Sequence, residues 1–70
     1  MFHKKDFGIR LRQLRNGRNE NQKVLAELLN VTVTQVSDME NGKVSTTLEK
    51  LVLICEHYNV SSDYLLGLKD

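Results

Sequence analysis

The sequence contains no proline, and it has only four glycines and one cysteine in 70 residues. It also lacks any run in which apolar and polar residues alternate, the pattern of half-buried strands. With few turn residues and no strand pattern, the chain is expected to be helical throughout. A hydrophobic content of 40% is enough for one core in a chain of this size and not for two. We therefore expect a single all-α domain over residues 1–70, with no separate sensor domain.

A single cysteine excludes an internal disulfide. Cys55 lies in the apolar run 51–55, where a small hydrophobic residue is expected, so we interpret it as a reduced core residue. That run is the longest apolar stretch, and a membrane span needs about 18 to 20 apolar residues. The N-terminus also lacks the hydrophobic region of a signal peptide. These absences predict a cytoplasmic protein that does not contact the membrane.

Catalytic and metal-binding patterns are missing as well. There is no glycine-rich phosphate loop, no Ser-His-Asp arrangement and no close pair of carboxylates in a plausible pocket. His3 and His57 are far apart in the sequence and lack the cysteine or carboxylate spacing of a zinc site. We therefore predict no enzymatic activity, no cofactor and no metal.

The net charge of +1 is unevenly distributed. Residues 1–23 hold seven basic and two acidic residues, and residues 24–70 hold three basic and seven acidic ones, which gives +5 and −4. Such asymmetry indicates a surface that can turn a basic face toward phosphates, or simply a solvated face. Lys4 and Lys5 are expected in a short arm, residues 1–5, that is basic or disordered. The arginines interpreted as solvated are Arg10, Arg12 and Arg18.

Helical spacing of apolar residues, together with capping residues, divides the chain into five helices. The third, over residues 33–40, is only about two turns long. The expected caps and stops, in chain order, are Asp6 and Gly17, Asn21 and Asn30, Thr32 and Asn41-Gly42, Thr47, and finally Ser61 or Ser62 with Gly67.

The spacing from the second helix to the third is the most informative feature. Ala26 is small enough for a point where two steeply crossed helices bring their backbones together. The residues expected to fill the wedge between them are Leu25, Leu29, Val31, Val36 and Met39. The remaining face of the third helix is polar, so its inner face can anchor it while its outer face contacts base edges.

In combination these residues resemble the phage-repressor and Cro type of helix-turn-helix, also called the XRE family, over residues 7–67. The matching segments are Gln22-x-x-Leu25-Ala26-Glu27, Asn30-Val31-Thr32, Val36-x-x-Met39-Glu40-Asn41-Gly42-Lys43 and 58–67. The resemblance implies a compact five-helix, lambda-repressor-like domain with the helix-turn-helix at its second and third helices. It also implies binding as a homodimer to a nearly palindromic operator in double-stranded DNA.

The resemblance assigns roles residue by residue. Gln22 matches a residue that contacts phosphate and braces the recognition helix. Arg15 and Glu40 match an ion pair that ties the first helix to the end of the third. Gln35 is expected to point away from DNA. The residues that match base and phosphate contacts are Thr32, Val33, Thr34, Ser37, Asp38, Asn41 and Lys43.

The chain departs from the family pattern before the second helix, where Asn19 and Glu20 replace a glycine and an apolar residue. This predicts a looser loop or one with an exposed polar side. The usual proline before the fourth helix is absent. Val33 offers only apolar contact, and Asp38 either accepts from a cytosine amine or is a surface acid.

We expect a repressor or Cro-like regulator of a phage or mobile element, with an antagonist or antirepressor protein as a further partner. The alternative is an antitoxin-like or regulator-binding module whose main partner is a protein. Its supporting feature is the apolar C-terminal end, which we interpret as core plus the edge of a homodimer. The candidates for the dimer interface are Tyr58, Tyr64, Leu65 and Leu68.

Overall fold

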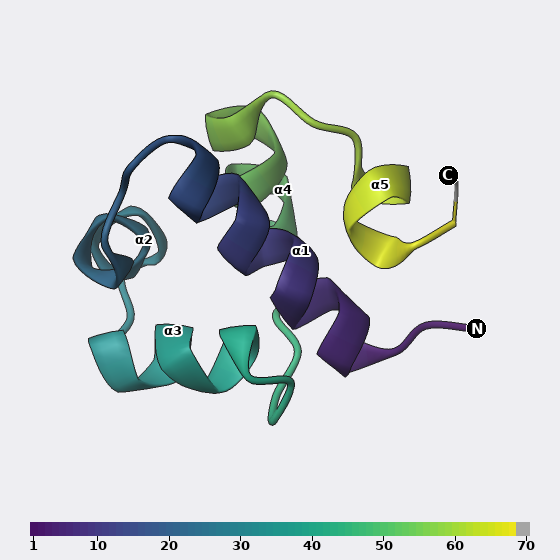
Figure 1. Cartoon of the computed structure of the whole chain (residues 1–70), viewed down its shortest axis with the longest axis horizontal. Coiled ribbons are helices and arrows are strands. Elements are labelled where there is room, and N and C mark those ends of the chain that lie inside the picture. The colour runs from purple at the N-terminus through teal and green to yellow at the C-terminus, as the bar shows by residue number, and fades with distance from the viewer. Residues whose placement is uncertain (69–70) are drawn as a thin grey trace.

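The computed structural model describes residues 1–68, which form five helices and, within that range, no strand (Figure 1). In chain order the helices are α1 (Lys4–Gly17), α2 (Gln22–Leu29), α3 (Val33–Glu40), α4 (Leu48–Tyr58) and α5 (Ser62–Leu66). The prediction of an all-α, five-helix fold is confirmed. Not one of these helices combines the length and the apolar character that a bilayer crossing requires.

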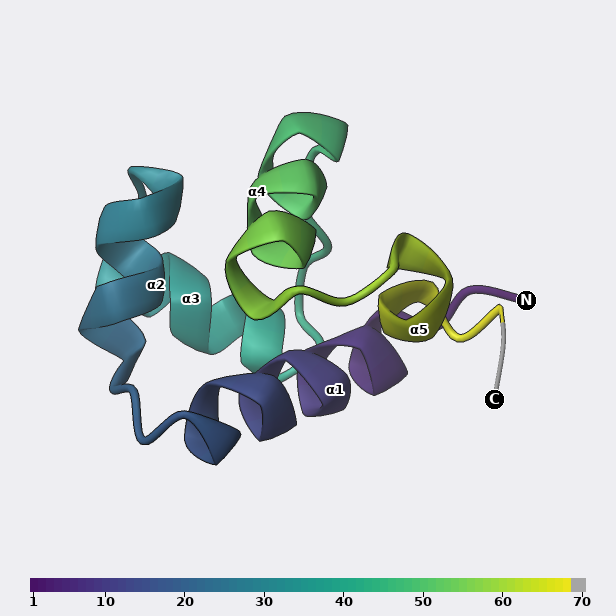
Figure 2. The same cartoon turned by 90° about the horizontal axis from the view of Figure 1, so that it is seen from above.

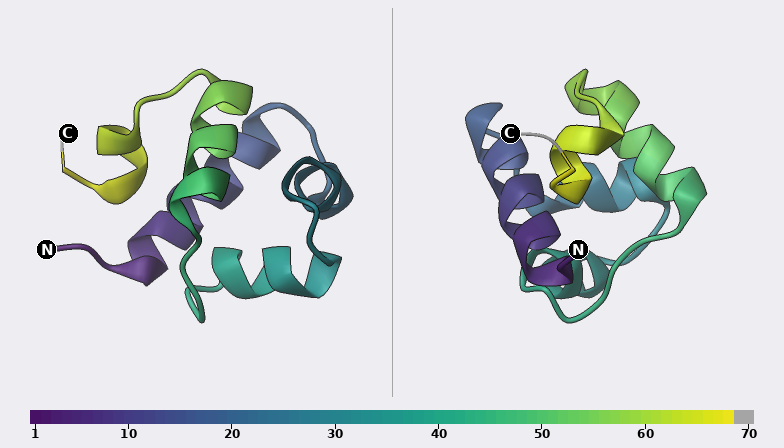
Figure 3. Two further views of the ribbon diagram at one scale, coloured as in Figure 1. Left: turned by 180° about the vertical axis from the view of Figure 1, so that it is seen from behind. Right: turned by 90° about the vertical axis from the view of Figure 1, so that its right-hand side faces the viewer.

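α1 crosses the centre of the molecule, with α2 and α3 on one side of it and α5 on the other (Figure 1). α4 lies behind α1 in that view, and Figure 2 separates the two. α1 packs against α3 and α5, α2 packs against α3 and α4, and α4 packs against α5. Seen from behind and from the side in Figure 3, α3 lies along one edge of the molecule. One side of α3 therefore faces its neighbours and the other faces outward.

The core takes side chains from all five helices, and it includes the residues expected in the wedge between α2 and α3. The buried apolar residues are Phe7, Leu11, Leu25, Ala26, Leu29, Val36, Met39, Ile54, Tyr58 and Leu65. Val31 and Cys55 are partly buried against this cluster. Burial raises the pKa of the Cys55 thiol, so it is held in its neutral form. The interpretation of Cys55 as a residue of the apolar interior is confirmed.

Two of the four residues predicted at a dimer interface belong to this core instead. The exposed fraction is 5% for Tyr58 and 0% for Leu65. Both side chains are covered within the single chain because α5 packs against α1 and α4. The interface prediction is therefore wrong for these two residues. Tyr64 and Leu68, with exposed fractions of 36% and 63%, stay accessible.

Local interactions begin and end α2, α3, α4 and α5 at the residues that the sequence predicts. Each capping side chain accepts a hydrogen bond from the backbone N–H three residues further on. The caps are Asn21, Thr32, Thr47 and Ser61. Left-handed residues close α2 at Asn30 (φ 55°) and α5 at Gly67 (φ 75°), as predicted, and α4 at Asn59 (φ 53°). The helix boundaries are thus encoded by residues next to them in the chain.

α1 begins earlier than predicted. Its N-cap is His3, and Asp6 lies inside the first turn, where its charge favours the positive end of the helix dipole. The Phe7 N–H donates to the His3 carbonyl at 3.1 Å, and the Phe2 ring packs on the Phe7 ring with 6.2 Å between centroids. These contacts extend the helix toward the N-terminus. Residues 4–5 therefore belong to α1 and not to an arm.

The backbones of α1 and α3 touch at Gly8. A Cβ added at Gly8 would lie 2.4 Å from the Met39 carbonyl oxygen and 2.5 Å from that of Glu40. Just beyond α3, Gly42 has a φ of 75°, and a Cβ there would lie 2.7 Å from the Lys5 Cα. The absence of a side chain at these two positions lets the start of α1 rest on the end of α3.

We predict that Gly8→Ala lowers the free energy of unfolding by about 1–3 kcal/mol, because the added methyl would overlap two backbone carbonyls. Gly17→Ala is the matched control, since a Cβ there meets nothing within 4 Å and alanine favours a helix by about 0.5–1 kcal/mol. Urea denaturation followed by circular dichroism measures both variants. A Gly8→Ala variant as stable as the parent would show that the two helices separate without cost.

Candidate nucleic-acid interface

A buried carboxylate joins three helices. The Glu40 side chain ends α3 and has an exposed fraction of 0%. Arg15 of α1 donates to both of its oxygens, from Nε to Oε2 at 2.6 Å and from Nη2 to Oε1 at 3.0 Å. Gln22, the first residue of α2, donates from Nε2 to Oε1 at 3.1 Å. The pair expected between Arg15 and Glu40 is present, and Gln22 reaches α3 through the same carboxylate.

These donors keep Glu40 ionised. Burial raises the pKa of Glu40, but the hydrogen bonds from Arg15 and Gln22 outweigh burial and hold the pKa below its ordinary value. Conversely, the hydrogen bond with Glu40 raises the pKa of Arg15. A buried charge that loses one partner is costly, because the remaining charge stays desolvated. The position of α3 is therefore tied to α1 and α2 by directional, charged contacts.

Glu20 is one of the two residues at which the sequence departs from the pattern that it resembles, and the structure gives it partners on α4. The Tyr58 hydroxyl donates to Oε1 at 2.8 Å, and Nε2 of His57 lies 2.8 Å from Oε2. Arg15 also donates from Nη1 to the Glu20 carbonyl at 2.7 Å. Burial raises the pKa of Glu20, but the hydrogen bonds from Tyr58 and His57 together lower it by more. The net effect is a pKa below the ordinary glutamate value. Glu20 thus holds the α1–α2 loop to α4, so the loop is not loose. The other expectation, an exposed polar side, holds for the rest of the loop, whose exposed residues are Arg18, Asn19 and Asn21.

The outward side of α3 carries the residues predicted to contact bases. Thr34 and Val33 are exposed, with Val33 at 46%, while Ser37 and Asp38 are half-buried. On the inward side Val36 and Met39 are buried, with exposed fractions of 0% and 4%. α3 therefore has one anchored face and one open face, as its polar pattern predicts.

Gln35, predicted only to point away from DNA, has a structural role. Its Oε1 accepts from the Thr32 N–H at 2.9 Å, and its own N–H donates to the Thr32 Oγ1 at 3.1 Å. This reciprocal capping box pre-forms the first turn of α3. The signal for it is a Thr followed three residues later by Gln, which is readable from the sequence.

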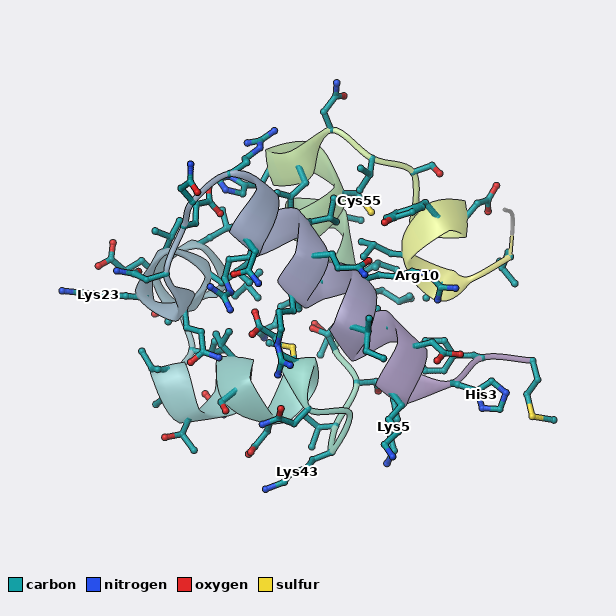
Figure 4. All side chains as sticks on the ribbon, viewed as in Figure 1. His3, Lys5, Arg10, Lys23, Lys43 and Cys55 are labelled. Atoms are coloured by element: carbon teal, nitrogen blue, oxygen red, sulfur yellow. The ribbon has the colours of Figure 1, made fainter. Side chains whose placement is uncertain are left out.

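Basic residues of α1 flank the end of α3. Lys4 donates from Nζ to the Lys43 carbonyl at 3.3 Å, and Lys43 Nζ lies 4.0 Å from Asp38 Oδ1. Figure 4 shows Lys5 and Lys43 pointing to the same side of the molecule as α3. The sequence prediction did not place these α1 residues beside α3. The available signal was the spacing 4, 8, 12 and 15, which puts Gly8 and three basic residues on one helix face.

Arg12, predicted to be solvated, also lies at this end of α3. Its Nη2 donates to Asn41 Oδ1 at 2.6 Å, and its Nε lies 3.5 Å from Glu40 Oε1. Asn41 in turn donates from Nδ2 to Ser37 Oγ at 3.3 Å. A chain of contacts therefore runs from the buried carboxylate to the outward side of α3. Within residues 1–68 no three His, Cys, Asp or Glu side chains gather as they would to hold a metal ion.

Comparison with known proteins places this geometry among DNA-binding regulators. A family model described as "Helix-turn-helix" matches residues 11–65. The chain is 41% identical over 62 residues to the HTH-type transcriptional activator BcrR of Enterococcus faecalis, covering 89% of this chain and 30% of that protein. It is 38% identical over 61 residues to the uncharacterized HTH-type transcriptional regulator YobD of Bacillus subtilis, covering 87% and 54%. The chain thus spans about half or less of these two relatives.

Among solved structures, the P22 c2 repressor in complex with a synthetic operator is similar with a TM-score of 0.81 and 25% identity. The match covers 90% of this chain and 96% of that one. The lambda-repressor-like fold predicted from the sequence is therefore confirmed.

We predict that the free energy of unfolding falls as the pH drops below the ordinary glutamate pKa of 4.5. Glu20 and Glu40 have lowered pKa values in the folded state, so their stabilisation is complete above 4.5 and is lost as the pH falls through the lower folded values. Glu20→Gln should make this dependence shallower. Denaturation midpoints between about pH 3 and pH 7 measure it.

The matched control for that experiment is Glu27→Gln, which changes an exposed glutamate on α2. It should leave the slope of stability against pH as it is in the parent. A slope unaltered by Glu20→Gln would mean that the contacts of Glu20 with Tyr58 and His57 do not contribute to stability.

Proposed function

This chain belongs to the XRE-type helix-turn-helix family, and on that premise we propose that it is a DNA-binding regulator of transcription whose α3 enters the major groove. The observation that carries the proposal is the two-sided character of α3. Its inner face is buried and its last residue, Glu40, is fixed by Arg15, whereas its outer face is open. A helix held in this way can present side chains to base edges without rearranging.

The proposal divides the contacts into two classes. Base edges are contacted by the outward residues of α3, with Val33 touching a thymine methyl and Thr34 and Ser37 forming hydrogen bonds. Asp38 accepts from a cytosine amine or pairs with Lys43. The residues proposed to contact the phosphate backbone are Gln22, Thr32, Asn41 and Lys43.

We add Lys4 and Lys5 to the phosphate contacts. Lys4 is bonded to the Lys43 carbonyl, and Lys5 points to the α3 side (Figure 4). Both belong to the basic first third of the chain, so that part of the charge asymmetry lies beside the proposed DNA-binding face. Phosphate contacts fix the orientation of a protein on the duplex and carry no base information.

As the mode of regulation we propose operator occupancy in the cytoplasm, in the manner of a repressor or Cro-like protein. The P22 c2 repressor is seen on a synthetic operator, and this chain shares its fold. BcrR is named an activator. The position of the operator relative to the promoter would decide whether binding represses or activates transcription. An antagonist protein remains a proposed partner.

We predict that Thr34→Ala and Ser37→Ala each weaken binding to a selected operator by about 1–3 kcal/mol, because each removes a base contact. Gln22→Ala should weaken binding to all sequences more evenly. Affinity should fall about a thousandfold from about 50 to 200 mM salt, as counterions are released from the phosphates. Fluorescence anisotropy with selected and scrambled duplexes measures these effects.

Ser62→Ala, at an exposed position of α5, is the matched control and should bind as the parent does. Circular dichroism should show that all variants keep the parent fold. An affinity independent of salt, or variants that lose stability instead of binding, would count against the proposal.

We further propose that the chain binds DNA as a homodimer through an apolar surface formed by the N-terminus, α4 and the second residue after α5. Leu48 and Leu68 are 80% and 63% exposed, and Phe2 is 42% exposed. These three line one hollow together with Leu51 and Leu66. Contiguous exposed apolar surface of this kind is typical of protein interfaces.

For the dimer we predict that Leu48→Lys shifts the chain toward the monomer and weakens operator binding, because it puts a charge into the apolar contact. Ile9→Lys is the control, since Ile9 is 50% exposed but lines a different hollow with Asp6, Arg10 and Gln13. Analytical ultracentrifugation at micromolar concentration measures the oligomeric state. A parent chain that is monomeric both free and on DNA would rule the homodimer out.

A further inference from the structure

The contacts at the end of α3 determine which way the Ser37 hydroxyl can form hydrogen bonds. A serine hydroxyl can usually donate or accept, so it does not by itself discriminate between base edges. In this chain Ser37 is not independent, because Asn41 donates to its Oγ at 3.3 Å. Asn41 lies four residues after Ser37, on the same side of the helix.

The orientation of the Asn41 amide is set by Arg12. A guanidinium group only donates, so the atom of Asn41 that lies 2.6 Å from Arg12 Nη2 must be the oxygen. The amide nitrogen then faces Ser37. Arg12 itself is held near the buried Glu40 carboxylate, with 3.5 Å between Nε and Oε1.

The consequence for Ser37 is a bias toward donation, because one of the two lone pairs of its oxygen is already used. Its oxygen accepts from the amide nitrogen, and its own proton has no acceptor among residues 1–68. The free proton is available on the half-buried, outward side of α3. Ser37 is therefore prepared to donate a hydrogen bond.

We propose that Arg12 and Asn41 are positioning residues that make Ser37 a hydrogen-bond donor toward the major groove. In the major groove guanine presents two acceptors, N7 and O6, whereas cytosine presents only an amine donor. The base next to Ser37 is then one that presents an acceptor, as adenine N7 and thymine O4 also do, so guanine is favoured over cytosine. This inference rests on the proposed function, because it requires that α3 lies in the groove.

The test is to select binding sites from a random DNA pool with the parent chain and with variants. The parent should prefer guanine to cytosine by about fivefold to tenfold at one position of each half-site. Ser37→Ala should lose the preference at that position and keep it at the others, which identifies the position. If Ser37→Ala changes no position, the inference is overturned.

Asn41→Asp is the decisive variant. A carboxylate still accepts from Arg12 but cannot donate, so the Ser37 proton must turn toward it and leave the Ser37 oxygen to accept. The preference at the identified position should move from guanine toward cytosine. Val44→Asp, exposed in the α3–α4 loop, adds the same charge outside the chain of contacts and should lower affinity without changing the preference. An unchanged guanine preference in Asn41→Asp would overturn the inference.

Two variants of Arg12 distinguish a role in positioning the Asn41 amide from general support of the fold. Arg12→Lys retains a group that only donates and should preserve the guanine preference, whereas Arg12→Met should let the amide turn and reduce the preference. Loss of the preference in both variants, or in neither, would contradict the assigned role. If the parent selects no sequence at all, the proposed function fails; if it selects sites whose preferences ignore Arg12 and Asn41, only this inference fails.

Discussion

The Glu40 carboxylate is the group on which the arrangement of the first three helices depends. A carboxylate removed from water is costly unless charged donors surround it. Here Arg15 donates two hydrogen bonds to it and Gln22 donates a third. Because hydrogen bonds are directional, they hold the end of α3 in one orientation, which apolar packing alone would specify less sharply. The close contact at Gly8 then brings the backbones together where this carboxylate lies.

The same junction extends outward in two directions. Arg15 donates to the Glu20 carbonyl in the α1–α2 loop. The Glu20 side chain in turn contacts Tyr58 and His57 on α4. Through Arg12 the junction reaches Asn41 and the outward side of α3. A polar network therefore supports the face proposed to meet DNA, and it links that face to the opposite side of the domain.

The helices, four of their five caps and the two faces of α3 were predictable because these signals are local. An N-cap and the N–H it accepts from are three residues apart, and helical periodicity repeats within a few residues. The contacts of Arg12 with Asn41 and of Glu20 with Tyr58 join residues 29 and 38 positions apart, so they follow from tertiary packing that periodicity does not describe. The burial of Tyr58 has the same origin. The base and phosphate contacts stay predictions, since they concern atoms of DNA.

The chain of contacts through Asn41 has a consequence for how such domains diversify. If the hydrogen-bonding character of Ser37 is set from α1, then the unit that carries base preference is not the eight-residue α3 alone. Transplanting α3 into a relative would carry the serine without the arginine that gives it direction. Sequence changes at Arg12, Ser37 and Asn41 should then be inherited together, as a set of distant positions that vary in concert.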